Sequence, residues 1–449
     1  MQKGKIRINT ENIFPIIKKA VYSDHEIFLR ELVSNSVDAI SKRRMASFAG
    51  DCENCESPQV KITIDREKNT LTISDNGIGM NDEEIKKYIN QVAFSSAEEF
   101  LEKYKKDNDE FIGHFGLGFY SSFMVSDKVE IITKSAIGEN KAFKWSCDGS
   151  PSFTLEDTER EEIGTDVILY LLDEEKEFIE PARIKSLIKK YCDFMPIDVL
   201  LEGECINKKN PPWRKNPNEL NDEDYIELYK YLYPYQGEPL LWIHLNTDFP
   251  YNIQGILYFP KLSGRADWEK GEIKLYCNQV FVSDSIKEIV PRYLLPLRGV
   301  IDSTDIPLNV SRSALQTDRK VRSISSFISK KIANKLKDLL KNNPDFYAEI
   351  WDSISAFVKI GVMEDEKFSE LAQNSIIFET KLGSDLVKEE EIENKFLIKF
   401  NDKFFTTLEN YSNRNNKNDD NKIIYCTDEI SQSNALNLWL SNNREVIKA

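Results

Sequence analysis

The stretch FLRELVSNSVDA, residues 28–39, constrains the fold of this chain more than any other segment. On a helix, at roughly 100° per residue, Glu31, Asn35 and Asp38 fall on one line because they are spaced i, i+4 and i+7. The opposite side carries residues that a core would accept: Leu29, Leu32, Val33, Ser36 and Ile40. Most surface helices have such a polar face, so this stretch alone predicts an amphipathic helix and assigns no chemistry to it.

The composition limits the classes of protein to consider. The chain has 449 residues, of which 41% are hydrophobic and 30% charged, as expected for a globular protein of two or three domains. Its formal charge of −15 argues against wrapping nucleic acid, which requires a basic surface. No apolar run approaches the roughly 20 residues of a membrane helix, and the N-terminus lacks the apolar core of a signal peptide. We therefore expect a cytoplasmic protein.

The hydrophobic patterns of the first half predict an α+β fold. Helices are expected over residues 11–23, 24–48 and 82–105, with Ser23 or Asp24 as the N-cap of the second helix. Alternating residues predict a β-hairpin within 60–73, and further strands at 128–134, 141–147 and 165–172. Helices would then cover a mostly antiparallel sheet, because the regular strand-helix alternation of a parallel sheet is missing.

The second half predicts a separate α/β domain. We place an N-terminal domain at 1–205, a polar, proline-bearing linker at 206–222 and a middle domain at 223–449. Within the middle domain, strands are expected in 240–246, 252–260 and 273–284, and long helices in about 322–360. We assign 323–400 to a helical part, 401–449 to a small α/β part that ends strand-helix-strand, and 410–422 to a loop.

Two glycine-bearing motifs could bind a ligand. Asp75 ends a predicted strand in LTISDNGIGM, where its carboxylate could accept a hydrogen bond from an exocyclic amine. Gly77 and Gly79 would permit close backbone approach, although an ordinary Asp-Asn-Gly turn explains this motif equally well. The G-x-x-G-x-G of Gly113, Gly116 and Gly118 could present backbone amides to phosphate. Its spacing fits neither the dinucleotide motif nor the P-loop.

The line of polar residues on the first helix could serve the same ligand. The amide oxygen of Asn35 is a ligand that Mg²⁺ accepts together with phosphate oxygens. Glu31, one turn earlier, could orient and deprotonate a water molecule.

The order of these pieces resembles the ATPase superfamily of gyrase B, heat-shock protein 90, sensor histidine kinases and MutL. The sequence of these segments is most similar to that of the heat-shock protein 90 family, in particular its bacterial members. The resemblance covers essentially the whole chain and rests on YSDHEIFLRELVSNSVDA, TLTISDNGIGM, IGHFGLGFYSSFMVSDKV, GTDVILYLL, LYCNQVFVSD and YLLPLRGVIDSTDIPLNVSRSALQ. It implies a two-layer α/β sandwich ATPase domain followed by an α/β middle domain.

The resemblance also implies a function and a set of site residues. The function would be an ATP-driven chaperone with ATP and Mg²⁺ as ligands, and its partners would be partly folded client proteins and co-chaperones. Glu31 would be the general base, Asn35 the Mg²⁺ ligand and Asp75 the partner of the adenine amino group. Arg312 would reach the γ-phosphate from the middle domain, with Gln316 beside it. The remaining nucleotide-site residues would be Asp38, Gly79, Met80, Gly113, Gly116, Gly118, Phe119 and Thr165.

Two departures from the family pattern modify these expectations. Phe94 stands where many members have a lysine, so a cation that faces phosphate would be missing or supplied elsewhere. The family normally continues into a C-terminal dimerisation domain, whereas this chain stops where the middle domain would finish. We therefore expect a homodimer for the full-length form, and a largely monomeric chain with slow hydrolysis here.

Trp268, in the polar stretch SGRADWEKGE, is either a client contact or a tryptophan folded onto its own domain.

Two other classes of protein share parts of this pattern. A histidine kinase would use His25 as phosphoacceptor, but kinases place that residue on a separate upstream domain for which this chain has no residues. A MutL-like or topoisomerase relative needs a basic DNA surface, which the net charge opposes. Assays of protein-bound phosphate and of DNA binding separate these classes.

Cys52 and Cys55 form one C-x-x-C, but a structural zinc site usually needs four ligands, so free thiols are favoured.

Overall fold

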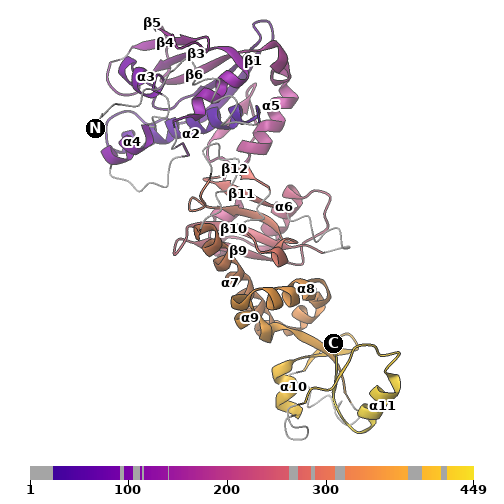
Figure 1. Ribbon diagram of the computed structural model, residues 1–449. Helices are drawn as coiled ribbons and strands as arrows, with labels where there is room; N and C mark the ends of the chain where they lie inside the picture. Colours follow the sequence, from indigo (N-terminus) through magenta and orange to yellow (C-terminus); the bar gives the residue numbers. More distant parts are fainter. Residues whose placement is uncertain are drawn as a thin grey trace, which may run out of the picture.

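Three β-sheets and their helices follow one another along an elongated molecule (Figure 1). The computed structural model describes residues 24–91, 96–104, 112–113, 116–139, 141–261, 272–284, 289–308, 319–382, 397–415 and 422–449. The helix expected over 11–23 lies outside these residues, as do Phe94, Trp268, Arg312 and Gln316.

The first sheet has eight strands in the order β5-β4-β3-β6-β2-β1-β7-β8. Every neighbouring pair is antiparallel except β1 with β7, which confirms the predicted α+β class. Strand β5 was not predicted, because this short edge strand is mostly exposed and its sequence TLEDT lacks apolar alternation. The strands are β1 (Gln59–Asp65), β2 (Thr70–Asp75), β3 (Ser126–Lys134), β4 (Ala142–Cys147), β5 (Thr154–Thr158), β6 (Gly164–Leu171), β7 (Asp198–Leu201) and β8 (Glu204–Cys205).

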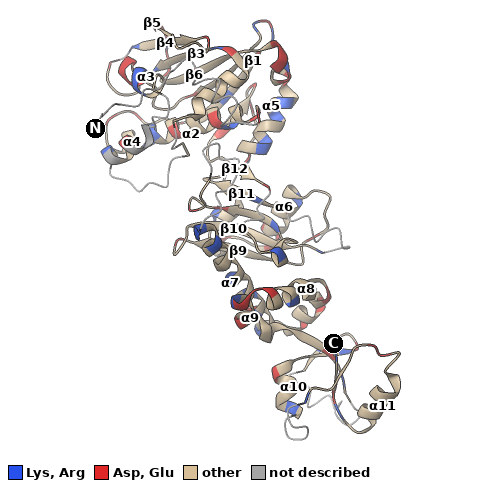
Figure 2. Cartoon of the chain, viewed as in Figure 1, with Lys and Arg blue, Asp and Glu red and all other residues tan. Residues whose placement is uncertain are grey.

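Helix α2 (Ile27–Phe48) is the predicted amphipathic helix, and it packs against the sheet. All five residues assigned to its apolar side are buried. The helix begins later than predicted, at Ile27. Its N-cap residue is Glu26, whose side chain makes no capping hydrogen bond. The Glu26 carboxylate instead binds Arg183 at 2.5 Å and Lys190 at 2.7 Å. These ion pairs tie the start of α2 to the basic residues around α5 (Figure 2).

The first sheet and its helices, within residues 24–205, form what we call the first unit, and some of its other helical elements pack on α2. The helix expected over 82–105 is two helices, α3 (Asp82–Tyr88) and α4 (Ser96–Tyr104), and the first of them starts in a capping box of Asn81 and Glu84. A 3₁₀ helix, η4, follows the glycine motif and packs on α2. The remaining bounds are η4 (Gly118–Met124), η5 (Asp173–Ile179), α5 (Pro181–Leu187) and η6 (Ile188–Cys192).

The second sheet lies below the first in Figure 1 and has the order β12-β11-β13-β10-β9. The strands expected at 240–246 and 252–260 are confirmed as β9 and β10, whereas the segment 273–284 forms two antiparallel strands, β11 and β12, because a turn at Asn278 and Gln279 interrupts it. Two long helices follow it, and Pro344 separates them at the first position of α8. The elements are α6 (Asp222–Leu232), β9 (Leu241–Thr247), β10 (Ile253–Phe259), β11 (Glu272–Cys277), β12 (Val280–Ser283), η10 (Arg292–Leu294), β13 (Arg298–Asp302), α7 (Arg319–Asn342), α8 (Pro344–Glu364), α9 (Glu366–Ala372) and η11 (Gln373–Ser375).

The third sheet has the order β15-β16-β14-β18-β17. Its strand β14 begins at Ile377, so this α/β part starts earlier than the expected residue 401. The loop predicted at 410–422 is wrong for its first residues, which lie in α10. The predicted strand-helix-strand ending is confirmed by the last three elements. The bounds are β14 (Ile377–Lys381), β15 (Ile398–Phe400), β16 (Lys403–Thr407), α10 (Leu408–Asn415), β17 (Tyr425–Cys426), α11 (Ser433–Ser441) and β18 (Val446–Lys448).

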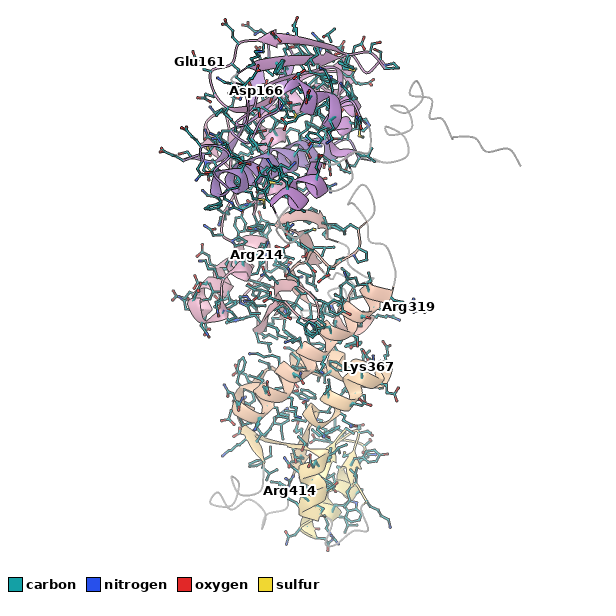
Figure 3. All side chains as sticks on the ribbon, turned by 90° about the vertical axis from the view of Figure 1, so that its left-hand side faces the viewer. Glu161, Asp166, Arg214, Arg319, Lys367 and Arg414 are labelled. Atoms are coloured by element: carbon teal, nitrogen blue, oxygen red, sulfur yellow. The ribbon has the colours of Figure 1, made fainter. Side chains whose placement is uncertain are left out.

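The segment expected as a linker contributes to the core between the first two sheets. It contains two short 3₁₀ helices, η7 (Pro212–Arg214) and η8 (Pro217–Glu219). Trp213 is completely buried, its ring centroid lies 4.6 Å from that of Phe194, and its Nε1 donates to Asp302 at 3.2 Å. Arg214, at this junction in Figure 3, donates to Gln254 at 2.6 Å. The polar composition concealed this packing, which depends on one tryptophan.

Candidate active site

The polar line of α2 faces the glycine motif. Arg30, which is buried, donates from Nε and Nη2 to Oε1 of Glu31 at 3.1 and 2.7 Å. Asn35 is exposed one turn later. A Cβ atom on Gly118 would lie 2.8 Å from Oε2 of Glu31 and 3.7 Å from Nδ2 of Asn35. A larger residue at position 118 would therefore have to displace the Glu31 carboxylate, whereas it would meet Asn35 at an ordinary contact distance.

The other end of the motif meets the same helix. A Cβ atom on Gly113 would lie 3.1 Å from Oδ2 of Asp38 and 3.6 Å from Oδ1 of Asn35. The described residues 112–113 and 116–118, which we call the glycine segment, thus lie along the line of Glu31, Asn35 and Asp38. Gly116 has a φ of +63°, a conformation that glycine adopts without steric cost.

Asp38 is hydrogen-bonded through its carboxylate to the backbone of the glycine segment. Its buried carboxylate accepts hydrogen bonds from the backbone amides of Ile112 at 2.8 Å and Gly113 at 2.7 Å. Sequence reasoning placed Asp38 on the polar line but had no means of finding partners so far along the chain.

Asp75 lies at the end of β2 with its carboxylate buried against α2. Burial raises its pKa to about 7, although a hydrogen bond from the Gly77 amide at 2.9 Å and the charge of Arg160 act in the opposite direction. The backbone at Gly77 packs closely on α2, and a side chain would not fit there, because a Cβ atom would lie 2.6 Å from the backbone of Ala39. This close packing against α2 distinguishes the Asp-Asn-Gly sequence from an ordinary surface turn.

Sequence reasoning missed Ser36, whose side chain hydrogen-bonds to Asp75. It was assigned to the apolar face of α2, and it is indeed buried there. A serine within an otherwise apolar face was the signal that could have identified it, since buried hydroxyl groups need partners.

Gly79, Met80 and Thr165 gather beside Asp75 where three strands end. Gly79 has a φ of +66°, and a Cβ atom there would lie 1.9 Å from the carbonyl oxygen of Lys134. The Met80 amide donates to Oγ1 of Thr133 at 2.9 Å, and that oxygen lies 2.9 Å from Oγ1 of Thr165. Thr165 also pairs with Asp75 in the register of β2 and β6. The predicted residues are thus brought together, and Thr133 is a linking residue that the sequence did not reveal.

Phe119, expected at the phosphates, lies in an aromatic cluster. Its ring centroid is 5.5 Å from that of Tyr120, 6.2 Å from that of Phe123 and 5.7 Å from that of Trp145. This packing holds the start of η4 against the sheet. The predicted roles of Arg312 and Gln316, and the consequence of Phe94, fall outside the described residues.

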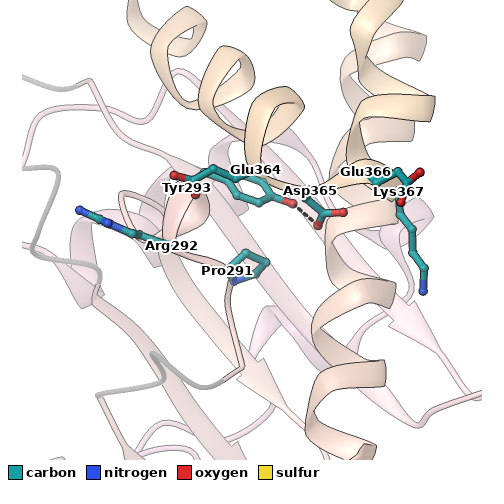
Figure 4. Close-up of a pocket in the computed structure, with 7 residues that line it drawn as sticks. All are labelled: Pro291, Arg292, Tyr293, Glu364, Asp365, Glu366 and Lys367. Carbon is teal, nitrogen blue, oxygen red and sulfur yellow. Dashed lines mark hydrogen bonds between the residues drawn. The ribbon is translucent and has the colours of Figure 1, made fainter.

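A cysteine pair and a cavity lie elsewhere in the described chain. Cys52 and Cys55 are half-buried free thiols, and within the described ranges no cluster of three or more His, Cys, Asp or Glu residues is arranged to hold a metal ion. A cavity of about 400 Å³ lies between η10 and the turn from α8 to α9 (Figure 4). Tyr293 donates to Asp365 at 2.9 Å in its wall. This cavity shares no residue with the site on α2.

Comparison with protein families defines the class of this site. Residues 22–161 match the family described as histidine kinase-, DNA gyrase B-, and HSP90-like ATPase. The first unit is therefore an ATPase domain of this superfamily. Residues 198–448 match the family described as Hsp90 protein. The chain belongs to the heat-shock protein 90 family, which separates it from the kinase and DNA-processing branches.

Individual relatives agree with this assignment. The chain is 51% identical over 393 residues to the chaperone protein HtpG of Bacteroides thetaiotaomicron, an alignment that covers 84% of this chain and 58% of the relative. It is 49% identical over 394 residues to chaperone protein HtpG of Porphyromonas gingivalis, with 84% and 58% covered. The corresponding protein of Roseobacter denitrificans is 37% identical over 361 residues, with 79% and 58% covered. The chain thus spans less than two thirds of the length of these relatives.

None of the described helices is long and apolar enough to cross a membrane.

Proposed function

We propose that this chain binds ATP with Mg²⁺ between α2, the end of β2 and the glycine segment, and hydrolyses it as the ATPase part of a chaperone. The observation that carries the proposal is the approach of Gly118 to Glu31 and Asn35, on the same helix that buries Asp75. A carboxylate, an amide and exposed backbone are thereby combined in one site. The chaperone role rests on the names of the relatives.

The Asp75 end of the site would bind the adenine base. A carboxylate there can accept a hydrogen bond from the exocyclic amine, and the base would lie beside the backbone of Gly79 and Met80. Thr165 supports this end through its contact with Thr133, which in turn holds the Met80 amide. Close packing around Gly77 and Gly79 favours a rigid pocket that is preformed before the ligand arrives.

The Glu31 end would perform the chemistry. Arg30 holds Oε1 of Glu31, and Oε2 is directed to the glycine segment, where phosphate would meet backbone amides. Glu31 would accept a proton from the attacking water. Asn35 carries the kind of oxygen that Mg²⁺ accepts and is exposed at the same place, so the residues present fit this ion. Bound Mg²⁺ would neutralise charge on the phosphates.

The finer parts of the proposal extend beyond the described residues. Arg312 and Gln316 would act on the γ-phosphate from the second domain, as the family resemblance implies. The partners would be partly folded client proteins and co-chaperones. A longer form would be a homodimer in the cytoplasm. We also retain two domains at residues 1–205 and 223–449, with the segment 206–222 packed between them through Trp213.

The adenine assignment is tested by comparing ATP with inosine triphosphate, which carries an oxygen atom in place of the exocyclic amine. We expect the wild-type chain to bind ATP at least about tenfold more tightly, because a lone oxygen would face a buried carboxylate. Asp75→Asn should lose most of this preference, whereas the exposed control Asp127→Asn should keep it. Equal binding of both nucleotides by the wild-type chain would contradict the assignment.

A further inference from the structure

We propose that Asp38 is a positioning residue that fixes the glycine segment on α2, and that it does not bind the nucleotide itself. This inference rests on the proposed ATP site. It assigns to Asp38 a mechanical role in the presentation of backbone amides to the phosphates, and it replaces the direct contact expected from the sequence.

Both oxygens of the Asp38 carboxylate are used by the segment. Oδ1 accepts from the Ile112 amide at 2.8 Å, and Oδ2 accepts from the Gly113 amide at 2.7 Å. Hydrogen bonds to an ionised carboxylate are stronger than those between neutral groups, and two from consecutive amides fix the direction of the backbone. Asp38 as a residue is 7% exposed, so water competes weakly for these bonds.

The position of this attachment determines what it can control. Ile112 is buried in the core of the first unit, so one side of the attachment is anchored. Gly113, on the other side, lies beside both Asp38 and Asn35, while Gly118 lies against Glu31. A displacement of Gly113 would therefore change how the segment meets the two residues proposed to hold Mg²⁺ and to activate water.

The groups that face Asp38 include one cation. Lys42, one turn further along α2, interacts electrostatically with Asp38, and burial lowers the pKa of Lys42 while the charge of Asp38 acts in the opposite direction. A substitution of Asp38 therefore changes this interaction as well as the two backbone bonds. Lys42→Met removes the cation and leaves the carboxylate in place, and this variant separates the two effects.

The experiment compares Asp38→Asn with the wild-type chain and with the exposed control Asp127→Asn. An asparagine can accept through its oxygen only, so one backbone amide loses its partner. We expect hydrogen exchange at the Ile112 and Gly113 amides to accelerate at least about tenfold. Affinity for ATP should fall about tenfold, whereas affinity for adenosine, which has no phosphates, should stay within about twofold. Lys42→Met should leave the exchange rates unchanged.

A second variant keeps the test valid if Asp38→Asn folds poorly. Gly113→Ala places a Cβ atom 3.1 Å from Oδ2 of Asp38 and should produce the same selective loss of ATP affinity. Equal losses for ATP and adenosine, or unchanged exchange at both amides in Asp38→Asn, would overturn the positioning role. If the wild-type chain binds neither ligand, the proposed ATP site fails, and the exchange rates alone still decide whether Asp38 fixes the segment.

Discussion

Gly118 and Glu31 are in contact across the candidate site: a Cβ atom on Gly118 would lie 2.8 Å from Oε2 and 3.4 Å from Cβ of Glu31. The nearest atom is the end of a flexible side chain. A larger residue at position 118 would therefore displace the Glu31 carboxylate before it disturbed the backbone. This relationship connects the glycine motif directly to the proposed general base.

Gly118→Ala should consequently reduce ATP turnover much more than stability. We expect a loss of turnover of at least about tenfold, because a displaced base no longer reaches the water that it must deprotonate. The free energy of unfolding should change by less than about 1 kcal/mol. Steady-state turnover and denaturant unfolding measure the two effects. Gly237→Ala is the matched control, since a Cβ atom there meets no other atom within 4 Å.

The affinity for adenosine should depend on pH through Asp75. Burial raises the pKa of this carboxyl to about 7, and the proposed hydrogen bond from the adenine amine needs the ionised form. Below about pH 7 the affinity should therefore fall by up to about tenfold per pH unit, and above it should level off. Adenosine titrations between pH 5.5 and 8.5 test this expectation without titrating phosphates. A flat profile would indicate that Asp75 does not contact the base.

The free energy of unfolding of the unliganded chain should also depend on pH through Asp75, and it should fall as the pH rises. Because the pKa of Asp75 is raised by folding, the unfolded chain releases this proton between about pH 4 and 7 while the folded chain retains it. The group therefore lowers the free energy of unfolding as the pH rises through this range. Asp75→Asn removes the effect. Relative to wild type, it should gain roughly 2 to 3 kcal/mol between pH 5 and pH 8, measured by urea unfolding. Asp127→Asn should show no such gain.

Trp213 should couple the first two units of the fold. It is completely buried and donates to Asp302, another buried residue. Trp213→Ala should cost roughly 3 to 5 kcal/mol through cavity formation, and should separate one unfolding transition into two. Trp213→Phe keeps most of the volume but leaves Asp302 without this donor, at a cost of about 1 to 3 kcal/mol. Calorimetry of both variants distinguishes packing from hydrogen bonding.

The sequence predicted those features of the site that local patterns encode. Alternation identified β1 and β2, and therefore the position of Asp75 at a strand end. Helical periodicity identified the buried apolar residues of α2, although Asp38 on the polar line is buried as well. Family resemblance then gave roles to Glu31 and Asn35, and these roles remain predictions. Each of these steps depends on neighbours within a few residues along the chain.

What the sequence did not reveal depends on distant partners. The bonds from Asp38 to Ile112 and Gly113 span more than 70 residues, and no local pattern indicates them. Trp213 was concealed within a polar segment because a single large apolar side chain leaves no periodicity. The division of residues 82–105 into two helices was missed for a different reason: the charged residues there suit either one helix or two.

The most direct test of the account is the comparison of ATP binding with ATP turnover in Glu31→Gln. This variant keeps the shape of the side chain and removes its ability to accept a proton. The account predicts that affinity for ATP with Mg²⁺ stays within about threefold of wild type while the single-turnover rate falls by about 10² or more. If Glu31→Gln hydrolyses ATP as fast as the wild-type chain, Glu31 is not the base, and the proposed mechanism is wrong.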